Sequence, residues 1–177
     1  EEGMMGVSTG AAMNGMRPFY MHNRPDFILM AFNQLVTHAA KFHFMDNGQT
    51  TVPMVVWAAI GRGWGSGAQH SQAIQGIPLG VPGLKIVMPS TPYDAKGLML
   101  SAIADNNPVL IFEHRWLMRK DGIVPEGFYT VPLGKGVYRR RGADLTIAGA
   151  SHTLELAFQA ANKLAAPKML LVEDSAD

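Results

Sequence analysis

The sequence lacks cysteine altogether, has almost balanced charge and contains no long apolar run. The absence of cysteine excludes disulfide bonds and thiolate metal sites, and it fits a reducing compartment. The formal net charge is only +1, and the basic stretch at 138–142 is too short to indicate a nucleic-acid surface. Because no apolar run reaches about 18 residues, we expect no membrane span. No signal peptide is visible.

The composition of the chain is that of a folded protein. Of its 177 residues, 47% are hydrophobic and 16% are charged, which predicts a packed core rather than disorder. This length suits one sizeable domain, or one domain and part of another. The chain begins with EEGMMG and not with an initiating Met, so we interpret it as a fragment or as part of a longer chain.

Apolar runs alternate with helical patterns through the first two thirds of the chain. We expect helices at 3–16, 24–49 and 90–106, and strands at 17–23, 51–60, 84–90 and 107–116. The strand at 51–60 is a continuous β-rich run, typical of a strand covered on both faces. The alternation predicts an α/β domain over residues 1–117, with a mostly parallel sheet flanked by helices and without its N-terminal strand.

The last third of the chain has a different organisation. Residues 118–132 combine Gly, Pro and charges, as in a linker. A strand–helix–strand unit is then predicted at 145–151, 152–166 and 168–174. One such unit cannot bury both faces of a parallel sheet. We therefore expect residues 133–177 to be the truncated start of a second α/β domain, or a domain completed by a neighbouring chain.

Glycines gather in two places. Gly3, Gly6 and Gly10 lie in the first predicted helix, where each costs about 1 kcal/mol relative to Ala unless close packing against another backbone offsets it. The stretch GRGWGSGAQHSQ at 61–72 is a phosphate cradle, a plain connection or a frame that presents His70. It matches neither GxxxxGK[ST] nor a GxGxxG that opens a helix, so the cradle is the weakest interpretation.

Other catalytic and metal motifs are poorly matched. His38 and His43 are five residues apart, which does not give the i,i+4 pair of an HExxH zinc site. Ser66 and Ser71 flank His70, but no GxSxG elbow supports either as a nucleophile.

Several longer motifs, taken together, are much more specific. They are E-x-G-x-x-G-x-x-x-GAAM-x-G-x-RP from residue 1, AQHSQ, PGLKIVMPSTPYDAKGLMLSAIADNNPV and PLGKG, in this order. With them the chain resembles the beta subunit of thiamine-diphosphate-dependent 2-oxoacid dehydrogenases of the pyruvate dehydrogenase type. The resemblance implies a transketolase-like pyrimidine-binding domain over 1–117 and the start of a transketolase C-terminal-like domain over 133–177.

The resemblance also implies an activity, the oxidative decarboxylation of a 2-oxoacid with acyl transfer to lipoyl. Pyruvate, branched-chain acids and acetoin-type substrates all fit the motifs. Two alternatives stay open. One is a transketolase or deoxyxylulose-phosphate synthase, which shares the fold and the glutamate. The other is a truncated, non-catalytic assembly or binding module of the same fold.

Three site residues follow from the matched motifs. The resemblance places Glu1 at N1′ of the cofactor's aminopyrimidine, where a shared proton promotes deprotonation of the thiazolium C2 and the cofactor then serves as electron sink. It places Phe27 as the ring that stacks on the pyrimidine, and His70 near the reacting centre. The polar stretch at 22–24 and the bulky Trp64 depart from the usual family pattern.

Metal ions and partners are implied in the same way. The segment SAIADNNP matches a potassium site, with Ala102, Ile103, Asp105 and Asn107 as candidate ligands; a capped helix C-terminus is the alternative interpretation. The chain has no GDG-type diphosphate motif, so the resemblance implies that a partner alpha subunit in an α2β2 assembly holds Mg²⁺ and the diphosphate. A lipoyl acyltransferase core is the further partner, and the compartment is the bacterial cytoplasm or the mitochondrial matrix.

Overall fold

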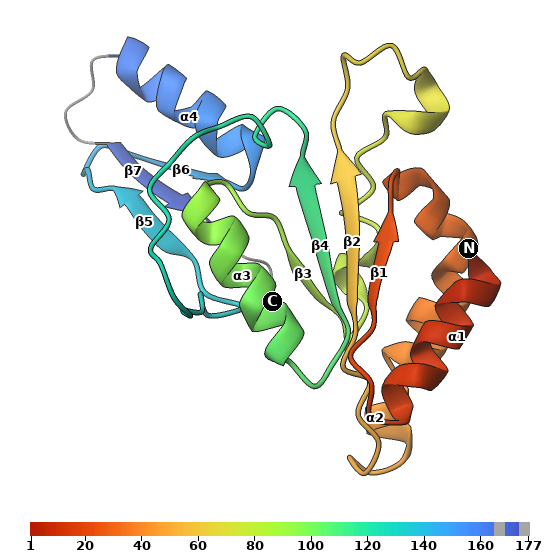
Figure 1. Ribbon diagram of the computed structural model, residues 1–177. Helices are drawn as coiled ribbons and strands as arrows, with labels where there is room; N and C mark the ends of the chain where they lie inside the picture. The colour runs from red at the N-terminus through yellow and green to blue at the C-terminus, as the bar shows by residue number, and fades with distance from the viewer. Residues whose placement is uncertain (165–168, 174–177) are drawn as a thin grey trace.

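The computed structural model describes residues 1–164 and 169–173. Its larger sheet has four parallel strands in the order β1-β2-β4-β3 (Figure 1). The strands are β1 (Phe19–His22), β2 (Val55–Ile60), β3 (Lys85–Val87) and β4 (Val109–His114). Because the strands are parallel, their carboxyl ends share one edge of the sheet, the upper edge in Figure 1. This confirms the predicted mostly parallel sheet.

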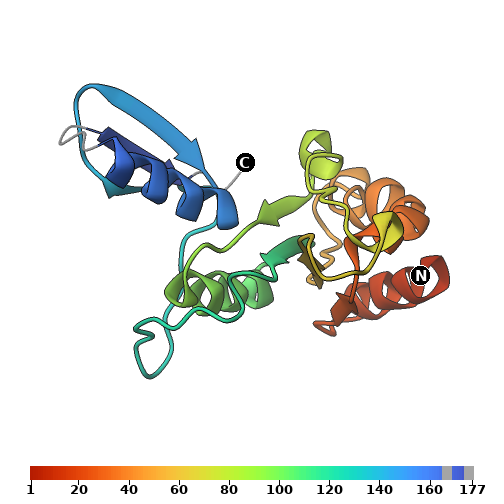
Figure 2. The same cartoon turned by 90° about the horizontal axis from the view of Figure 1, so that it is seen from above.

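Both faces of this sheet are covered, as the continuous apolar run of β2 predicts. Val56 and Ala58 face one core cluster, together with residues of α1 (Glu2–Met13). Val55 and Trp57 face a second cluster, under α3 (Pro92–Ala104). Successive side chains of a strand point to opposite faces, which explains the alternation. Figures 1 and 2 show α1 and α3 on opposite sides of the sheet.

The single long helix predicted at 24–49 is wrong. The structure has a 3₁₀ segment η1 (Pro25–Ala31), a wide π segment η2 (Asn33–Ala39) and a short helix α2 (Phe42–Met45). The Thr37 hydroxyl donates to the Asn33 carbonyl oxygen, and Nδ1 of His38 lies 3.2 Å from the same oxygen. Side chains that bond backbone carbonyls in this way compete with the regular helical ladder.

The predicted end of that segment, near 47–48, agrees with the structure. Asn47 and Gly48 both have the left-handed φ values that end helices, 59° and 82°. The predicted start of α3 also agrees, because the Thr91 hydroxyl accepts the backbone N–H of Asp94 at 3.1 Å with Pro92 in the first turn.

A smaller sheet lies beside the first one (Figures 1 and 2). Its order is β5-β7-β6, with β5 (Val137–Arg140), β6 (Leu145–Gly149) and β7 (Met169–Glu173), and α4 (His152–Lys163) follows β6. The predicted strand–helix–strand unit is therefore present as β6-α4-β7, although parts of its predicted range lie outside the described residues. The sequence did not predict β5, which pairs antiparallel with β7.

The segment at 118–132, predicted as a linker, is anchored along α3. The Tyr129 ring stacks on Tyr93 with 4.6 Å between centroids, and Val131 N–H donates to the Gly97 carbonyl at 3.2 Å. A Cβ on Gly97 would lie 2.4 Å from Cγ2 of Val131, so this approach requires glycine. Within the described residues, no helix is long and apolar enough to cross a membrane.

Candidate functional site

A pocket of about 410 Å³ opens beyond the carboxyl end of β1. Residues from the start of α1, from β1 and its following loop, from η1 and from η3 (Ala68–His70) meet there. Parallel α/β sheets hold ligands at this edge, outside the carboxyl ends of their strands. The lining residues are Glu1, Tyr20, Met21, His22, Asn23, Arg24, Phe27 and His70.

All three residues predicted for the cofactor site line this pocket. The ring of Phe27 meets the ring of His70 edge to face, with centroids 5.2 Å apart and planes at 73°. Glu1 lies at the same pocket and is exposed. The structure thus brings together Glu1, Phe27 and His70 from three separate segments, whereas their chemical roles stay predictions.

The glycine-rich loop after β2 leads directly to His70. Gly61 has φ of 125° and Gly67 has φ of 72°, values that favour glycine. A Cβ on Gly61 would also lie 3.2 Å from the His114 ring, so the chain passes close to β4 there. This geometry favours the interpretation of the loop as a frame that presents His70.

Trp64 lies outside the pocket lining. Its ring is 6.0 Å from the ring of Trp116, and the guanidinium groups of Arg115 and Arg119 lie 5.9 and 5.0 Å from its centroid. Trp116 is held in turn by its indole N–H, which donates to the Arg62 carbonyl at 3.2 Å. The unexpected tryptophan therefore packs against residues that follow β4.

Buried polar groups line the floor of the pocket. His22 is 5% exposed, and its Nε2 has no partner among the described residues. Burial lowers the pKa of His22 to about 4, although the Glu1 carboxylate opposes this shift, so the imidazole is neutral at pH 7. Burial, and next the charge of Glu1, raise the pKa of Tyr20.

The sequence did not identify Asp26 and Arg115 as site residues. Asp26 is buried, and its Oδ1 accepts the backbone N–H of Gln72 at 3.3 Å, which joins η1 to the loop around His70. Arg115 is buried too, and its Nη2 lies 3.5 Å from the His70 carbonyl oxygen. Arg115 follows β4 directly, so the rule that ligands gather at strand carboxyl ends was the signal available for it.

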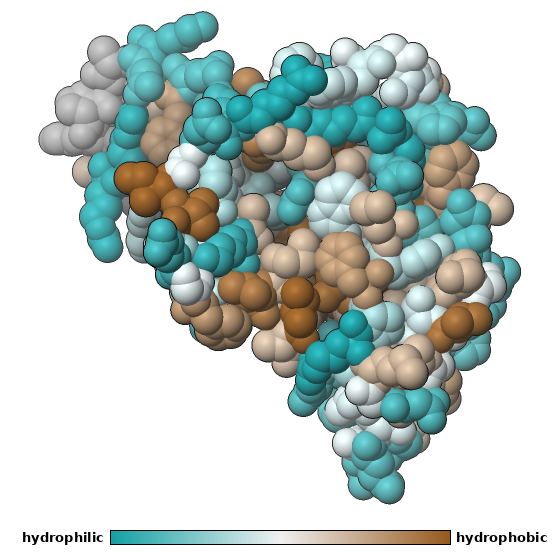
Figure 3. All heavy atoms as spheres, viewed as in Figure 1, coloured by the Kyte–Doolittle hydropathy of each residue, from teal (hydrophilic) through white to brown (hydrophobic). Residues whose placement is uncertain are grey.

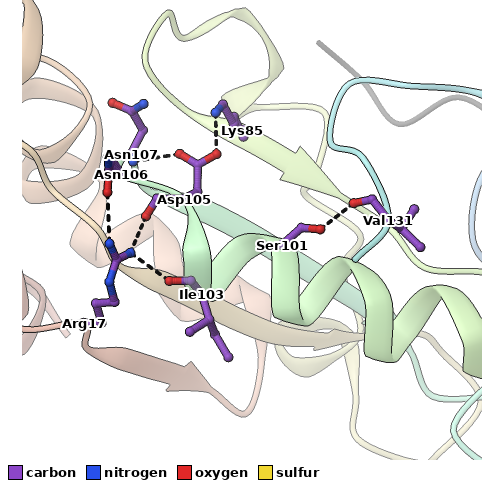
Figure 4. A network of polar contacts seen from close by, with 8 residues as sticks. All are labelled: Arg17, Lys85, Ser101, Ile103, Asp105, Asn106, Asn107 and Val131. Carbon is purple, nitrogen blue, oxygen red and sulfur yellow. Dashed lines mark hydrogen bonds and ion pairs between the residues drawn. The ribbon is translucent and has the colours of Figure 1, made fainter. Parts of the chain in front are cut away.

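The predicted potassium ligands lie at the carboxyl end of α3 and just beyond it (Figure 4). Arg17 Nη1 donates to the carbonyl oxygens of Ile103 and Asp105, at 2.8 and 2.7 Å. The Asp105 carboxylate pairs with Lys85 at 2.5 Å and accepts Asn107 N–H at 2.8 Å. The Ala102 carbonyl accepts the backbone N–H of Asp105 at 3.3 Å.

These contacts bear on the two interpretations of the segment. The Arg17 guanidinium already donates hydrogen bonds to carbonyl oxygens at the end of α3. A potassium ion at the same oxygens would be repelled by the positive charge of Arg17. The arrangement favours a helix C-terminus held by side chains, and the potassium site stays untested. Among the described residues, no group of three or more His, Cys, Asp or Glu side chains could hold a metal ion.

The comparison with protein families agrees with this fold. The family described as "Transketolase, pyrimidine binding domain" matches residues 1–120. The chain belongs to this family. Membership implies a thiamine diphosphate cofactor, and it confirms the predicted resemblance and fold class.

Three similar proteins are named as beta subunits of an oxidoreductase or a dehydrogenase. The chain is 43% identical over 164 residues to the acetoin:2,6-dichlorophenolindophenol oxidoreductase subunit beta of Bacillus subtilis, covering 93% of this chain and 48% of that protein. It is 44% identical over 165 residues to the 2-oxoisovalerate dehydrogenase subunit beta of the same organism, covering 93% and 50%. The pyruvate dehydrogenase E1 component subunit beta of Porphyra purpurea is 43% identical over 147 residues, covering 83% and 44%. The chain thus spans about half the length of these relatives.

Solved structures support the fold alone. A structure titled "Split gene transketolase, inactive beta4 tetramer" superposes with a TM-score of 0.77 at 21% identity, covering 99% of this chain and 54% of that one. Transketolase from Leishmania mexicana gives a TM-score of 0.79 at 19% identity, covering 99% and 26%.

Proposed function

We propose that this chain supplies the aminopyrimidine-binding half of the active site of a thiamine-diphosphate-dependent 2-oxoacid dehydrogenase. In this role it belongs to the beta subunit of a component that decarboxylates a 2-oxoacid oxidatively and transfers the acyl group to lipoyl. The observation that carries the proposal is the meeting of Glu1, Phe27 and His70 at one pocket. The names of the relatives point to the same class of reaction.

The pocket fits the aminopyrimidine in size and chemistry. The half-buried Phe27 offers a flat apolar wall for an aromatic ring. In this proposal the Glu1 carboxylate shares a proton with a ring nitrogen, a role supported by its position in the pocket lining. The neutral His22 leaves an unpartnered buried nitrogen at the same pocket. When bound, thiamine diphosphate supplies the nucleophilic carbon and the electron sink for decarboxylation.

His70 has a separate role in this proposal. Its ring packs against Phe27 and lines the pocket. These contacts support a role in which His70 hydrogen-bonds the substrate or moves a proton during turnover. The left-handed glycines before it fix where the ring lies.

A second chain is required to complete the site in this proposal. The outer face of α1 is apolar and uncovered: Met4 is 56% exposed, Val7 is 65% exposed, and Gly3 and Gly10 face open space. Figure 3 shows tan and brown apolar residues among polar ones on this side of the molecule. We infer that an alpha subunit docks in an α2β2 assembly and brings Mg²⁺ and the diphosphate site.

Further partners and location follow as parts of the same proposal. A lipoyl acyltransferase core receives the acyl group, and the complex works in a bacterial cytoplasm or a mitochondrial matrix.

The experiment combines the chain with a cognate alpha subunit, thiamine diphosphate and Mg²⁺, and follows decarboxylation of pyruvate and 2-oxoisovalerate. Glu1→Gln should lower kcat by about 100-fold or more, because the glutamine cannot share the proton. Glu2→Gln is the matched control, since Glu2 accepts a hydrogen bond from Asn33 at 2.9 Å and does not line the pocket. Unchanged turnover in Glu1→Gln would refute the proposal.

A further inference from the structure

Charged side chains that the proposed chemistry does not use lie in the pocket lining and next to it. Asp26 is 6% exposed, Arg115 is 8% exposed, and Arg24 is half-buried in the pocket lining. Within the described residues, the ion pairs closer than 4.0 Å involve other side chains. Neither guanidinium group is therefore held in a close ion pair, although the Glu1 carboxylate lies at the same pocket as Arg24 and the charge of Asp26 acts on Arg115.

Most donors of the two arginines are unused. A guanidinium has five N–H donors and no acceptor. Arg24 donates from Nη1 to the Asn23 carbonyl at 2.8 Å, and Arg115 donates from Nη2 to the His70 carbonyl at 3.5 Å. The Nε atoms of both side chains are buried and have no partner among the described residues. Buried donors normally have partners, so the site has room for an acceptor-rich group.

The pKa of Arg115 reflects both its burial and the positive charge of Arg24. Burial, and next the charge of Arg24, lower the pKa of the Arg115 guanidinium, and Asp26 opposes the shift. The two arginines thus repel each other through a poorly solvated region. An anion between them would relieve this repulsion and supply the missing acceptors.

Trp64 lies next to the Arg115 side chain. Trp64 presents its ring to the Arg115 guanidinium at 5.9 Å, within the range of a cation–π contact. Trp64 also packs on Trp116, which follows β4, so the glycine-rich loop and the end of β4 brace one another. Arg24 follows β1 and Arg115 follows β4, at the shared carboxyl edge of the sheet.

We propose that Arg24 and Arg115 form an anion-binding subsite beside Phe27 and His70 that takes a carboxylate or phosphate group of the substrate. The inference rests on the proposed function, because it places substrate in this pocket. It gives Trp64 a function as a positioning residue for Arg115. The anion has two possible sources, the carboxylate next to the reacting carbonyl or a second anionic group further along the substrate.

Binding without turnover tests the subsite. Calorimetry on the chain assembled with its alpha subunit, at constant ionic strength, measures Kd for pyruvate, 2-oxoglutarate and inorganic phosphate. We expect saturable binding that weakens about 10-fold or more in Arg24→Gln. Arg141→Gln is the control, since Arg141 is exposed over Tyr138 and should leave Kd unchanged. Equal Kd values for pyruvate and 2-oxoglutarate indicate that the subsite binds the carboxylate next to the reacting carbonyl. Tighter binding of 2-oxoglutarate or of phosphate indicates that it binds a second anionic group further along the substrate.

A buried arginine needs a second variant. Arg115→Gln removes a buried side chain and risks misfolding, so Arg115→Lys is compared with it, which keeps the charge and loses the planar guanidinium. Both should weaken binding. If no ligand binds saturably, or if Arg24→Gln and Arg141→Gln change Kd alike, the subsite is refuted. Anion binding in an assembly that decarboxylates nothing would instead refute the proposed function and leave the subsite intact.

Discussion

The ring of Phe27 meets the ring of His70 edge to face, with 5.2 Å between their centroids. The two residues come from η1 and η3, and the glycine-rich loop after β2 makes the contact possible. In the proposed site, Phe27 binds the pyrimidine ring and His70 acts on the substrate. The two functions can therefore be tested separately.

Replacing Phe27 should weaken cofactor binding more than it weakens the fold. Phe27→Leu keeps an apolar side chain but loses the flat ring, and aromatic pairs are worth about 0.5–1.5 kcal/mol beyond their buried area. We expect the Kd for thiamine diphosphate in the assembled complex to rise about 3–10-fold, measured by calorimetry. Phe44→Leu, at a side chain that is 88% exposed, should leave this Kd unchanged. Equal effects of the two variants would exclude a stacking role for Phe27.

His22 should make the stability of the chain depend on pH between about 4 and 6.5. Its folded pKa of about 4 lies below the ordinary 6.5, so in this window the unfolded chain binds more protons. Stability therefore rises with pH through the window and is lost as pH falls, by up to about 3 kcal/mol. Urea unfolding from pH 4 to 7 measures this dependence.

The variant His22→Gln should flatten that part of the profile. His43→Gln is the matched control, because His43 is exposed and its Nδ1 lies 2.8 Å from the Thr50 carbonyl oxygen. A profile of His22→Gln as steep as that of the unmodified chain would show that another group titrates in this window.

The sequence predicts those parts of the fold in which local pattern and tertiary contacts agree. The run at 55–60 alternates between two apolar clusters, so every side chain is apolar and the strand is evident. The 24–49 segment has helical spacing, but Thr37 and His38 bond the Asn33 carbonyl and widen the turn. β5 was missed because its pairing with β7 is a long-range contact without a local apolar pattern.

The candidate site shows the same division. Phe27 and His70 belong to motifs that can be recognised in the sequence alone, and the structure places them together. Arg115 stands in no motif, and its place beside His70 depends on the order of the strands and on the path of the glycine-rich loop. Its position at the carboxyl end of a predicted strand is the one signal for it in the sequence, and that signal does not tell which residues it meets.

Gly97 should be essential for the docking of the 118–132 segment on α3. A Cβ there would lie 2.4 Å from Val131 and 2.9 Å from the Tyr129 ring. Gly97→Ala should therefore destabilise the chain by about 1–3 kcal/mol, as overpacking does. Thermal unfolding measures the loss, and adding Val131→Ala should restore part of it.

Gly10→Ala is the matched control for a glycine within a helix. Nothing lies within 4 Å of a Cβ at Gly10, so this change should stabilise the chain alone by about 0.5–1 kcal/mol. If Gly97→Ala raised the melting temperature as Gly10→Ala does, the close approach of Val131 would be wrong.

Glu113 should give the opposite pH dependence to His22. It lies in a second cavity of about 350 Å³, lined also by residues of α3 and of the 118–132 segment, and accepts a hydrogen bond from Trp57. Burial raises the pKa of the Glu113 carboxyl above its ordinary 4.5, and the Trp57 bond only partly offsets this. The folded chain then binds more protons above pH 4.5, so stability falls as pH rises through the folded pKa.

The variant Glu113→Gln keeps an acceptor for Trp57 and removes this loss of stability. Urea unfolding at pH 5 and pH 8 should show the variant gaining on the unmodified chain at pH 8, whereas the exposed Glu126→Gln should gain nothing. A Glu113→Gln variant that is equally destabilised at both pH values would mean that the carboxylate is solvated in the folded chain.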